Sequence, residues 1–188
     1  CDITLNVPGK HNILNAVAAA ATALYVGADA ESVVKGLADF RGAKRRFEIL
    51  YNKNGVTIAD DYAHHPSELK VTLETAKALP YKRVVAVFQP FTYSRTSMLL
   101  DDFAEVLSIA DHAVLSEIMG SREKNTYNIY SKDLADKIDG CVWFTTFEEI
   151  ADYMDEQVAP GDLVLTLGCG DVYKCARMMI TKRKEHSK

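Results

Sequence analysis

The 188-residue sequence lacks the features that mark several large classes of protein. It has no basic surplus, because 22 Lys and Arg stand against 26 Asp and Glu and give a net charge of −4. Proteins that bind nucleic acid or anionic membranes neutralise phosphates with basic residues, so neither partner is expected. No apolar run approaches the roughly 18 residues of a membrane span, and no signal-peptide pattern opens the chain.

Cysteine is scarce and irregularly spaced. The four cysteines are Cys1, Cys141, Cys169 and Cys175. They include no Cys-x-x-Cys pair, so neither a disulfide framework nor a zinc knuckle is expected. Reduced and mostly buried thiols are typical of a cytosolic protein. The run G-x-x-x-x-G-K-[ST], which cradles nucleotide phosphates in many ATPases, is also missing.

From residue 83 onward, short apolar runs alternate with amphipathic segments. The pattern predicts strands at 83–88, 113–115, 141–145 and 162–167, and helices at 96–110, 132–138, 147–158 and 172–182. This alternation predicts right-handed βαβ crossovers and an α/β fold. We therefore expect a Rossmann-like, mainly parallel sheet with helices on both faces, which binds ligands at the carboxyl ends of its strands.

The first part of the chain follows a different pattern. It predicts a strand at 1–9, helices at 12–27 and 30–40, and strands at 47–51 and 56–59. The last two strands flank Asn-Lys-Asn-Gly, which is a hairpin signal. A basic connector, RGAKRR, separates them from the helices. We place a domain boundary at this connector, which divides the chain into residues 1–47 and 48–188.

Polar side chains crowd the end of the strand at 56–59. Asp61, Tyr62, His64 and His65 precede Pro66, which suits the first turn of a helix and makes the residue before it extended. This loop should face the ligand crevice. The alternative is local, with carboxylates as turn residues and a histidine bonded to the backbone. A metal site is a third interpretation, although adjacent histidines rarely face one ion and no third ligand is evident.

A second polar loop, FQPFTYSRT, follows the strand at 83–88 and contains Arg95. An arginine can hold a carboxylate or a phosphate with two parallel N–H donors. The alternative interpretation is an arginine in a surface ion pair. Two polar loops at the ends of strands that follow each other in the sequence favour a binding site.

Three further groups have two interpretations each. Asn12 and Asn15 share a helix face beside His11, where they could read a base edge or simply cap the helix. Lys44–Arg46 could clamp a phosphate or form a solvated surface. The run GCGDVY resembles a dinucleotide-binding loop, but Tyr173 occupies the place of its last glycine, so a tight turn from strand to helix is the preferred interpretation.

Taken in order, these motifs resemble the Mur ligases. The resemblance spans about residues 7–178 and is carried by GKHNILNAVAAAATA, LADFRGAKRRFE, DDYAHHPSE, FQPFTYSRT and GCGD. It implies three domains: one for a UDP-sugar, a central ATPase with a P-loop, and a Rossmann-like domain that brings an amino acid. The chain would then be a fragment, with a helical remnant of the central ATP-binding domain in 1–47 and the whole ligase domain in 48–188.

The twin histidines and the FQP–YSRT run are most similar to the Mur ligases that join L-alanine to UDP-N-acetylmuramate. The resemblance implies an ADP-forming amide ligase of bacterial peptidoglycan synthesis in the cytoplasm, with roles in cell wall biogenesis, cell shape and cell division. ATP would phosphorylate the muramoyl carboxylate and give an acyl phosphate, with Mg²⁺ as cofactor. The ligands of Mg²⁺ are expected mainly in the missing N-terminal part. The fragment should be inactive alone. Alternatives are a murein tripeptide ligase of the same superfamily and a non-catalytic nucleotide-binding module.

The resemblance also implies a nucleotide site. In it, His11, Asn12 and Asn15 would contact adenine. Arg46 would reach the ATP phosphates, and Asp61 would touch the nucleotide from the ligase domain. No metal ligand is assigned to this chain, and the missing N-terminal and central domains would be its partners.

The implied substrate site contains Tyr62, His64 and Arg95, with Arg95 as the candidate for the alanine carboxylate. Together with Arg46, His64 and Arg95 are the candidate catalytic residues. Two positions depart from the family pattern. Phe91 and Thr92 stand where some relatives carry His and Arg, and a cysteine replaces the commoner alanine in GCG.

Overall fold

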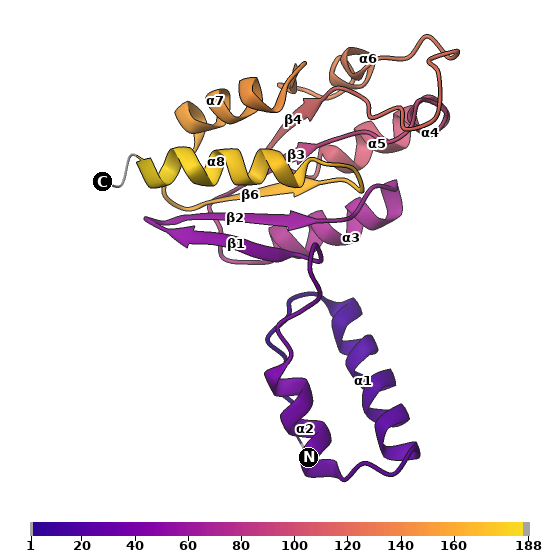
Figure 1. Cartoon of the computed structure of the whole chain (residues 1–188), viewed down its shortest axis with the longest axis vertical. Helices are drawn as coiled ribbons and strands as arrows, with labels where there is room; N and C mark the ends of the chain where they lie inside the picture. The colour runs from indigo at the N-terminus through magenta and orange to yellow at the C-terminus, as the bar shows by residue number, and fades with distance from the viewer. Residues whose placement is uncertain (1, 186–188) are drawn as a thin grey trace.

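The computed structural model describes residues 2–185, so Cys1 lies outside the described part. A six-stranded sheet occupies one end of the molecule, and a pair of helices stands away from it (Figure 1). The strands are β1 (Glu48–Lys53), β2 (Val56–Asp61), β3 (Arg83–Phe88), β4 (His112–Ser116), β5 (Val142–Phe144) and β6 (Asp162–Leu167). Their order is β1-β2-β6-β3-β4-β5, and only β1 runs antiparallel to its neighbour. The predicted α/β class and mainly parallel sheet are confirmed.

The apolar strands lie where the sequence predicts them because they are covered on both faces. Every residue of β2 and β6 is buried, and so is every residue of β3 after Arg83. A sheet with helices on both sides selects for such continuous apolar runs. The hairpin signal is also confirmed, since Asn54 and Gly55 have φ values of 53° and 76°. Two positive φ values are those of a type I′ turn, whose twist matches the flanking strands.

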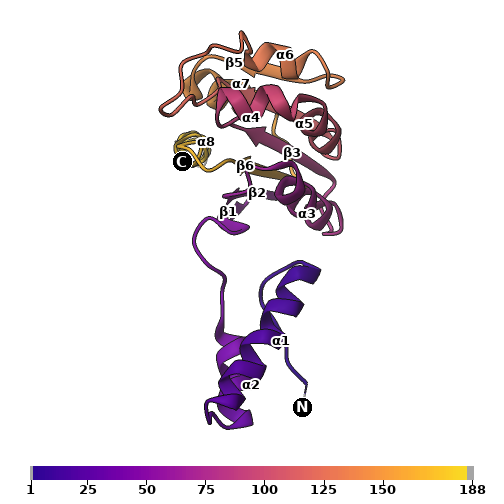
Figure 2. The ribbon, with the colours of Figure 1, turned by 90° about the vertical axis from the view of Figure 1, so that its right-hand side faces the viewer.

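Helices cover the two faces of the sheet in separate groups. On one face lie α3 (Pro66–Lys77), α5 (Leu100–Leu107) and α6 (Ser131–Ala135), and on the other lie α7 (Phe147–Gln157) and α8 (Tyr173–Glu185). Figure 2 shows α3 and α8 on opposite sides of the strands. Each face has its own hydrophobic core, centred on Phe88 and Phe103 on the first and on Ile150 and Met154 on the second.

The long helix predicted at 96–110 is wrong in one respect, because the segment forms two helices. These are α4 (Tyr93–Met98) and α5, and the chain breaks between them at Leu99, with φ −116° and ψ 26°. The first helix begins three residues early because Glu123, far along the chain, accepts a hydrogen bond from the Ser94 backbone N–H (2.9 Å). Local sequence periodicity does not contain that distant contact.

The helix pair consists of α1 (Lys10–Tyr25) and α2 (Ala30–Asp39). As predicted, Gly27 ends the first helix in a left-handed conformation (φ 96°). Ala16 is the one buried residue of the pair. The strand predicted at 1–9 is wrong over the described residues 2–9, because none of the six strands pairs with them. No helix among residues 2–185 is long and apolar enough to cross a bilayer.

The order of the strands decides which loops meet. β6 lies between β2 and β3 and pairs with both of them. The two polar loops singled out above are therefore not direct neighbours. The loop after β6, which begins with Gly168, lies between them at the carboxyl edge of the sheet.

Candidate active site

A cavity of about 630 Å³ lies where the start of α1, the connector and the end of β2 meet. Its walls include all five residues of the expected nucleotide site, namely His11, Asn12, Asn15, Arg46 and Asp61. These residues come from three separate stretches of the chain. Thr72 and Glu68 of α3 complete the wall on the side of the sheet. The fold thus brings together the five residues that were expected to form the nucleotide site.

The asparagines at the start of α1 do not cap the helix. Its N-cap is Gly9, and no side chain makes a capping hydrogen bond there. Asn12 Nδ2 instead donates to the Pro8 carbonyl (2.6 Å), and Asn15 Nδ2 lies 3.5 Å from Asn12 Oδ1. A Cβ on Gly9 would lie 2.5 Å from His11 Cε1, so the glycine makes room for this imidazole. The capping interpretation of Asn12 is therefore wrong.

Asp61 is buried in the cavity wall. Its Oδ2 accepts from the Phe47 N–H (2.7 Å), and its Oδ1 accepts from the Ala63 N–H (2.8 Å). Burial raises the pKa of Asp61, and these two hydrogen bonds and the charge of Arg46 counteract part of that rise. Each carboxylate oxygen accepts a backbone hydrogen bond, so Asp61 shapes the wall by fixing the connector and the start of the polar loop.

His64 lies against two oxygen acceptors. Its Nδ1 is 3.1 Å from the Tyr62 carbonyl oxygen and 3.2 Å from Glu68 Oε2. A proton on Nδ1 satisfies both oxygens, and Nε2 then carries a lone pair. The imidazole also makes an edge-on contact with the Tyr62 ring, at 5.6 Å between centroids. These contacts fix the ring at the mouth of the loop.

Glu68 is the carboxylate partner of this histidine. Burial acts to raise the pKa of Glu68. Hydrogen bonds from the backbone N–H groups of His64 and His65, together with the charge of His64, outweigh that effect. The pKa of Glu68 therefore lies below its ordinary value. An ionised Glu68 favours the proton on Nδ1 of His64.

His65 has a local role. Its extended backbone (φ −117°) forms the N-cap of α3, as Pro66 predicts, and its Nδ1 lies 2.9 Å from Ser67 Oγ. The adjacent histidines therefore do not converge on one point. Among residues 2–185, no three His, Cys, Asp or Glu side chains gather as a metal site.

Arg95 lies on α4, on the far side of β6 from the cavity. Its Nη1 donates to the Phe91 carbonyl (3.1 Å), and no carboxylate among residues 2–185 forms an ion pair with its guanidinium. The surface ion pair interpretation is therefore wrong. Glu123 holds the start of this helix through both Ser94 N–H and Ser94 Oγ (2.9 and 2.6 Å). Arg95 is half-buried, and its guanidinium has further N–H donors besides the one that bonds Phe91.

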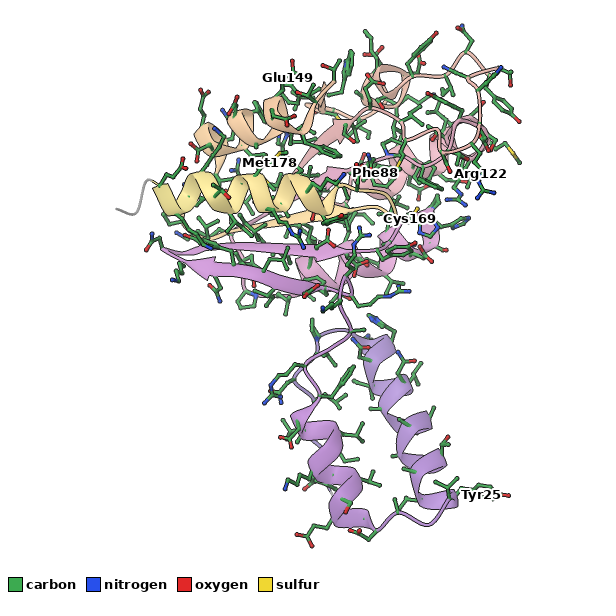
Figure 3. The ribbon with its side chains drawn as sticks, viewed as in Figure 1. Tyr25, Phe88, Arg122, Glu149, Cys169 and Met178 are labelled. Atoms are coloured by element: carbon green, nitrogen blue, oxygen red, sulfur yellow. The ribbon has the colours of Figure 1, made fainter. Side chains whose placement is uncertain are left out.

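The loop after β6 connects these two groups. Figure 3 labels Cys169 at the carboxyl edge of the sheet. Burial raises the pKa of the Cys169 thiol, and the charges of Arg95 and Arg45 counteract that rise. Cys169 therefore lies within electrostatic reach of the second polar loop and of the connector. Arg95 and the cavity residues face a common edge of the sheet but share no direct contact.

The glycines of this loop are bonded to the connector. The carbonyls of Gly168 and Gly170 accept hydrogen bonds from Arg45 (2.6 and 3.2 Å). Gln89 fixes the loop from β3, because its side chain makes two 3.0 Å hydrogen bonds with Asp171. The dinucleotide interpretation is not supported, in agreement with the sequence, which places Tyr173 where that motif needs glycine.

Sequence reasoning missed Arg45, Gln89 and Glu123. Each of them acts on a residue at least 29 positions away in the chain. The one available signal was the arginine doublet, in which Arg45 and Arg46 were considered together as a phosphate clamp. The structure separates them, because Arg46 lines the cavity while Arg45 points to the loop after β6.

Comparison with known proteins shows which proteins this chain is similar to. Residues 45–170 match the family described as "Mur ligase, glutamate ligase domain". The chain is 48% identical to a UDP-N-acetylmuramate–L-alanine ligase of Agathobacter rectalis over 96% of its own length and 40% of the relative. It is 47% identical to the enzyme of that name from Clostridium novyi, over 95% of this chain and 40% of the relative.

A solved structure agrees with these sequence matches. The crystal structure of UDP-N-acetylmuramate-alanine ligase from Thermotoga maritima superposes with a TM-score of 0.83 and 29% identity. It covers 100% of this chain and 41% of that chain. The chain therefore spans about 40% of the length of the relatives that it matches.

Proposed function

Because this chain belongs to the Mur ligase family, we propose that it is part of an ATP-dependent, ADP-forming ligase that joins L-alanine to UDP-N-acetylmuramate. The two bacterial relatives of nearly half-identical sequence carry the name of that activity. One structural observation supports the proposal most directly. Five residues assigned to ATP on sequence grounds line a single cavity.

The cavity suits a nucleotide in size and chemistry. Its volume of about 630 Å³ lies within the usual range of small-molecule sites. The paired amides of Asn12 and Asn15 offer donors and acceptors to the edge of an adenine. Arg46 supplies a guanidinium for the phosphates, and its planar fork matches phosphate oxygens. Asp61 holds the backbone on which that arginine is mounted.

The second loop suits the amino-acid end of the reaction. Arg95 has no carboxylate partner within the described residues and can take the alanine carboxylate in a bidentate pair. Nε2 of His64 can accept a proton from the attacking amine, while Glu68 stabilises the imidazolium that results. Tyr62 lies against His64 and Arg46 and connects the two groups.

The chemistry proceeds in two steps. The muramoyl carboxylate attacks the γ-phosphorus of ATP and forms an acyl phosphate, and ADP leaves. The alanine amine then attacks the acyl carbon, loses a proton, and releases phosphate. This chain contributes cationic stabilisation through Arg46 and positioning through Arg95. Among residues 2–185, no three His, Cys, Asp or Glu side chains gather around one point, and the ligands of Mg²⁺ are proposed to lie mainly in the remaining domains.

The remaining domains of the proposed enzyme would cover the helix pair. Leu14 and Val17 of α1 are exposed apolar side chains, and they line a groove of about 990 Å³ with Val71 of α3. We propose that residues 1–47 close a central ATP-binding domain and that residues 48–188 form the ligase domain. The family match begins close to this boundary, at residue 45. In this proposal the enzyme acts in the bacterial cytoplasm in peptidoglycan synthesis, and thereby in cell wall biogenesis, cell shape and division.

The test is ligase activity of the full-length protein. With ATP, Mg²⁺, UDP-N-acetylmuramate and L-alanine, we expect release of phosphate and formation of the alanyl product. A tripeptide offered in place of L-alanine should give little product, whereas a murein tripeptide ligase would prefer it. The 188-residue chain alone should show no turnover. Full-length protein that binds ATP without any product would instead indicate a non-catalytic module.

The same assay with Arg95→Lys tests the amino-acid site. Lysine keeps the charge but loses the two parallel donors of the guanidinium. A charge-assisted hydrogen bond contributes about 1.5–3 kcal/mol, so kcat/KM for L-alanine should fall roughly tenfold to a hundredfold. KM for ATP should change much less, because Arg95 does not line the cavity. A rise confined to the KM for ATP would make Arg95 a phosphate ligand instead.

A further inference from the structure

We propose that Arg45 is a positioning residue, which orients Arg46 and Tyr62 for the reaction through a stack of alternating arginine and tyrosine side chains. The inference rests on the proposed function for its kinetic readout. Arg45 does not line the cavity. It contacts the Tyr62 ring, which in turn contacts Arg46 of the cavity wall.

The guanidinium of Arg45 is held by three acceptors from distant parts of the chain. Nε donates to Asp60 Oδ2 (2.8 Å), Nη2 to the Gly168 carbonyl (2.6 Å) and Nη1 to the Gly170 carbonyl (3.2 Å). The Asp60 side chain is 1% exposed, and its other oxygen accepts from Thr166 Oγ1 (2.6 Å). A planar fork bonded on all its edges has one orientation. Arg45 is therefore a fixed point between β2 and the loop after β6.

Aromatic rings extend this fixed point to both sides. The guanidinium carbon of Arg45 lies 5.0 Å from the Tyr62 ring centre and 5.1 Å from that of Tyr173. Beyond Tyr62 lies Arg46, at 5.9 Å, and beyond Tyr173 lies Arg177, at 5.1 Å. We call this sequence of five side chains the Arg–Tyr stack. Cation–π contacts of this kind contribute about 0.5–2 kcal/mol each.

The backbone on both sides of Arg46 is also held in place. Arg45 and Phe47, on either side of it, have φ values of 56° and 49°. Left-handed conformations of such residues cost of order 1–3 kcal/mol each and persist only where the surroundings hold them. The Arg45 N–H donates to Glu48 Oε2 (2.8 Å), and the Arg45 carbonyl accepts from the Tyr62 N–H (2.8 Å). These bonds hold the turn that presents Arg46 to the cavity.

Arg46 itself has little else to orient it. Its side chain is exposed, its close aromatic contact is Tyr62, and it forms no ion pair within residues 2–185. The ring of Tyr62 is in turn placed by Arg45 and by His64. If the Arg45 guanidinium lost its hydrogen bonds, the Arg46 side chain would therefore be free to turn away from the position proposed to face the phosphates. With Arg45 in place, Arg46 and Tyr62 are attached to the sheet rather than to the helix pair.

The experiment is a double-mutant cycle in the full-length enzyme. Arg45→Lys keeps the charge and removes the fork, and Arg46→Ala removes the group on which Arg45 is proposed to act. We expect Arg45→Lys to lower kcat/KM for ATP roughly tenfold, as misplacement of a reacting group does. In the Arg46→Ala background, the same change should cost less than about twofold, because acting through one residue makes the effects non-additive.

A matched control separates positioning from stability. Arg83 also donates to a buried carboxylate, Asp162 (2.6 Å), and to the Gln157 carbonyl (2.6 Å), but it lies at the amino end of β3. Arg83→Lys should lower Tm about as much as Arg45→Lys and leave kcat/KM for ATP within about twofold. If both variants lower Tm and neither changes the kinetics, Arg45 is a structural residue only and the proposal is wrong. Effects of Arg45→Lys and Arg46→Ala that multiply would also overturn it.

Two further measurements keep the test decisive. Tyr173→Leu shortens the Arg–Tyr stack and leaves the bond between Arg45 and Asp60 in place. It can therefore be measured even if Arg45→Lys fails to fold. It should lower kcat/KM for ATP about twofold to fivefold. The affinity of the full-length protein for ATP provides a readout that does not depend on the ligase reaction. If no product forms with L-alanine, the proposed function fails, and the cycle in ATP affinity still decides whether Arg45 acts through Arg46. Unchanged affinity and kinetics in Tyr173→Leu would overturn the role of the stack.

Discussion

The helix pair and the sheet use apolar residues in opposite ways. In the sheet, Phe88 and Leu165 are completely buried between helices. In the helix pair, Leu14 is 72% exposed and Tyr25 is 91% exposed, although α1 is rich in alanine and apolar residues. Figure 3 shows Tyr25 at the end of the pair that lies farthest from the sheet. Both segments have apolar sequences, but only one of them finds its partners within residues 2–185.

This difference teaches that a helix can be predicted where its stability cannot. Helix propensity is local, and alanine supplies it to α1 without any tertiary contact. Most helical stability in proteins, however, comes from packing of an apolar face. The sheet has that packing on both faces. We therefore expect the two regions to respond very differently to truncation, to loss of apolar volume and to loss of a charge.

Truncation should separate the two regions most sharply. A chain that begins at Gly42 keeps Arg45 and its bonds to the sheet, and it should unfold cooperatively in urea, as single domains do. A chain that ends at Arg41 should lose most of its helical signal in circular dichroism, because isolated short helices are marginal in water. A dye-binding, non-cooperative product from the first chain would show that the sheet depends on the helix pair.

Loss of apolar volume should give the next largest contrast. Phe88→Ala empties a fully buried position, and core Phe→Ala changes cost about 3–5 kcal/mol of unfolding free energy. Leu14→Ala should change that free energy by less than about 0.5 kcal/mol in the 188-residue chain, since this side chain is already in water. Urea titration of both variants measures the contrast. Equal losses would mean that α1 packs on apolar surface in solution.

Loss of the Glu68 charge should have the smallest effect, and it should depend on pH. The pKa of Glu68 is lowered in the fold, so its contribution is fully present above its ordinary value of 4.5 and is lost as pH falls through the lowered pKa. Glu68→Gln should therefore destabilise by less than about 1 kcal/mol at pH 7. The difference in unfolding free energy between the variant and the parent protein should vanish in acid. A difference that is unchanged at pH 3 would contradict this assignment.

Glu74→Gln is the matched control for this pH series. Glu74 lies on the same helix, and its ion pair with Lys70 is long (3.9 Å) and exposed. Pairs of this kind contribute a few tenths of a kcal/mol. The unfolding free energy of Glu74→Gln should therefore stay close to that of the parent protein at every pH.

Sequence reasoning succeeded where a pattern and its cause are local. The strands at 83–88 and 162–167 were predicted with their observed bounds, because continuous apolar runs record burial on both faces. Asn54 and Gly55 identified a turn whose φ requirement only a few residues satisfy. Pro66 correctly indicated that His65 is extended before α3, and the local interpretation of a histidine bonded to the backbone holds for His65, whose side chain accepts from the Ser67 N–H.

The rest of the site depends on contacts between distant residues. The sequence predicts parallel strands but not that β6 lies between β2 and β3. Without that order, the neighbours of Arg45 at Gly168 and Gly170 cannot be inferred, since more than 120 residues separate them. The two arginines of the connector are chemically identical in the sequence. Only the fold decides that one of them lines the cavity and the other braces it.

The central place of β6 also has a consequence for the order in which the protein is made. A ribosome delivers β2 and β3 long before β6, yet these two strands do not pair with each other. Until residue 167 has emerged, the sheet is divided into two halves, and the carbonyls that hold Arg45 follow only with residues 168 and 170. A chain that is cut short during synthesis would therefore lack the acceptors that fix Arg45, and such unfinished sheets expose strand edges and are prone to aggregation.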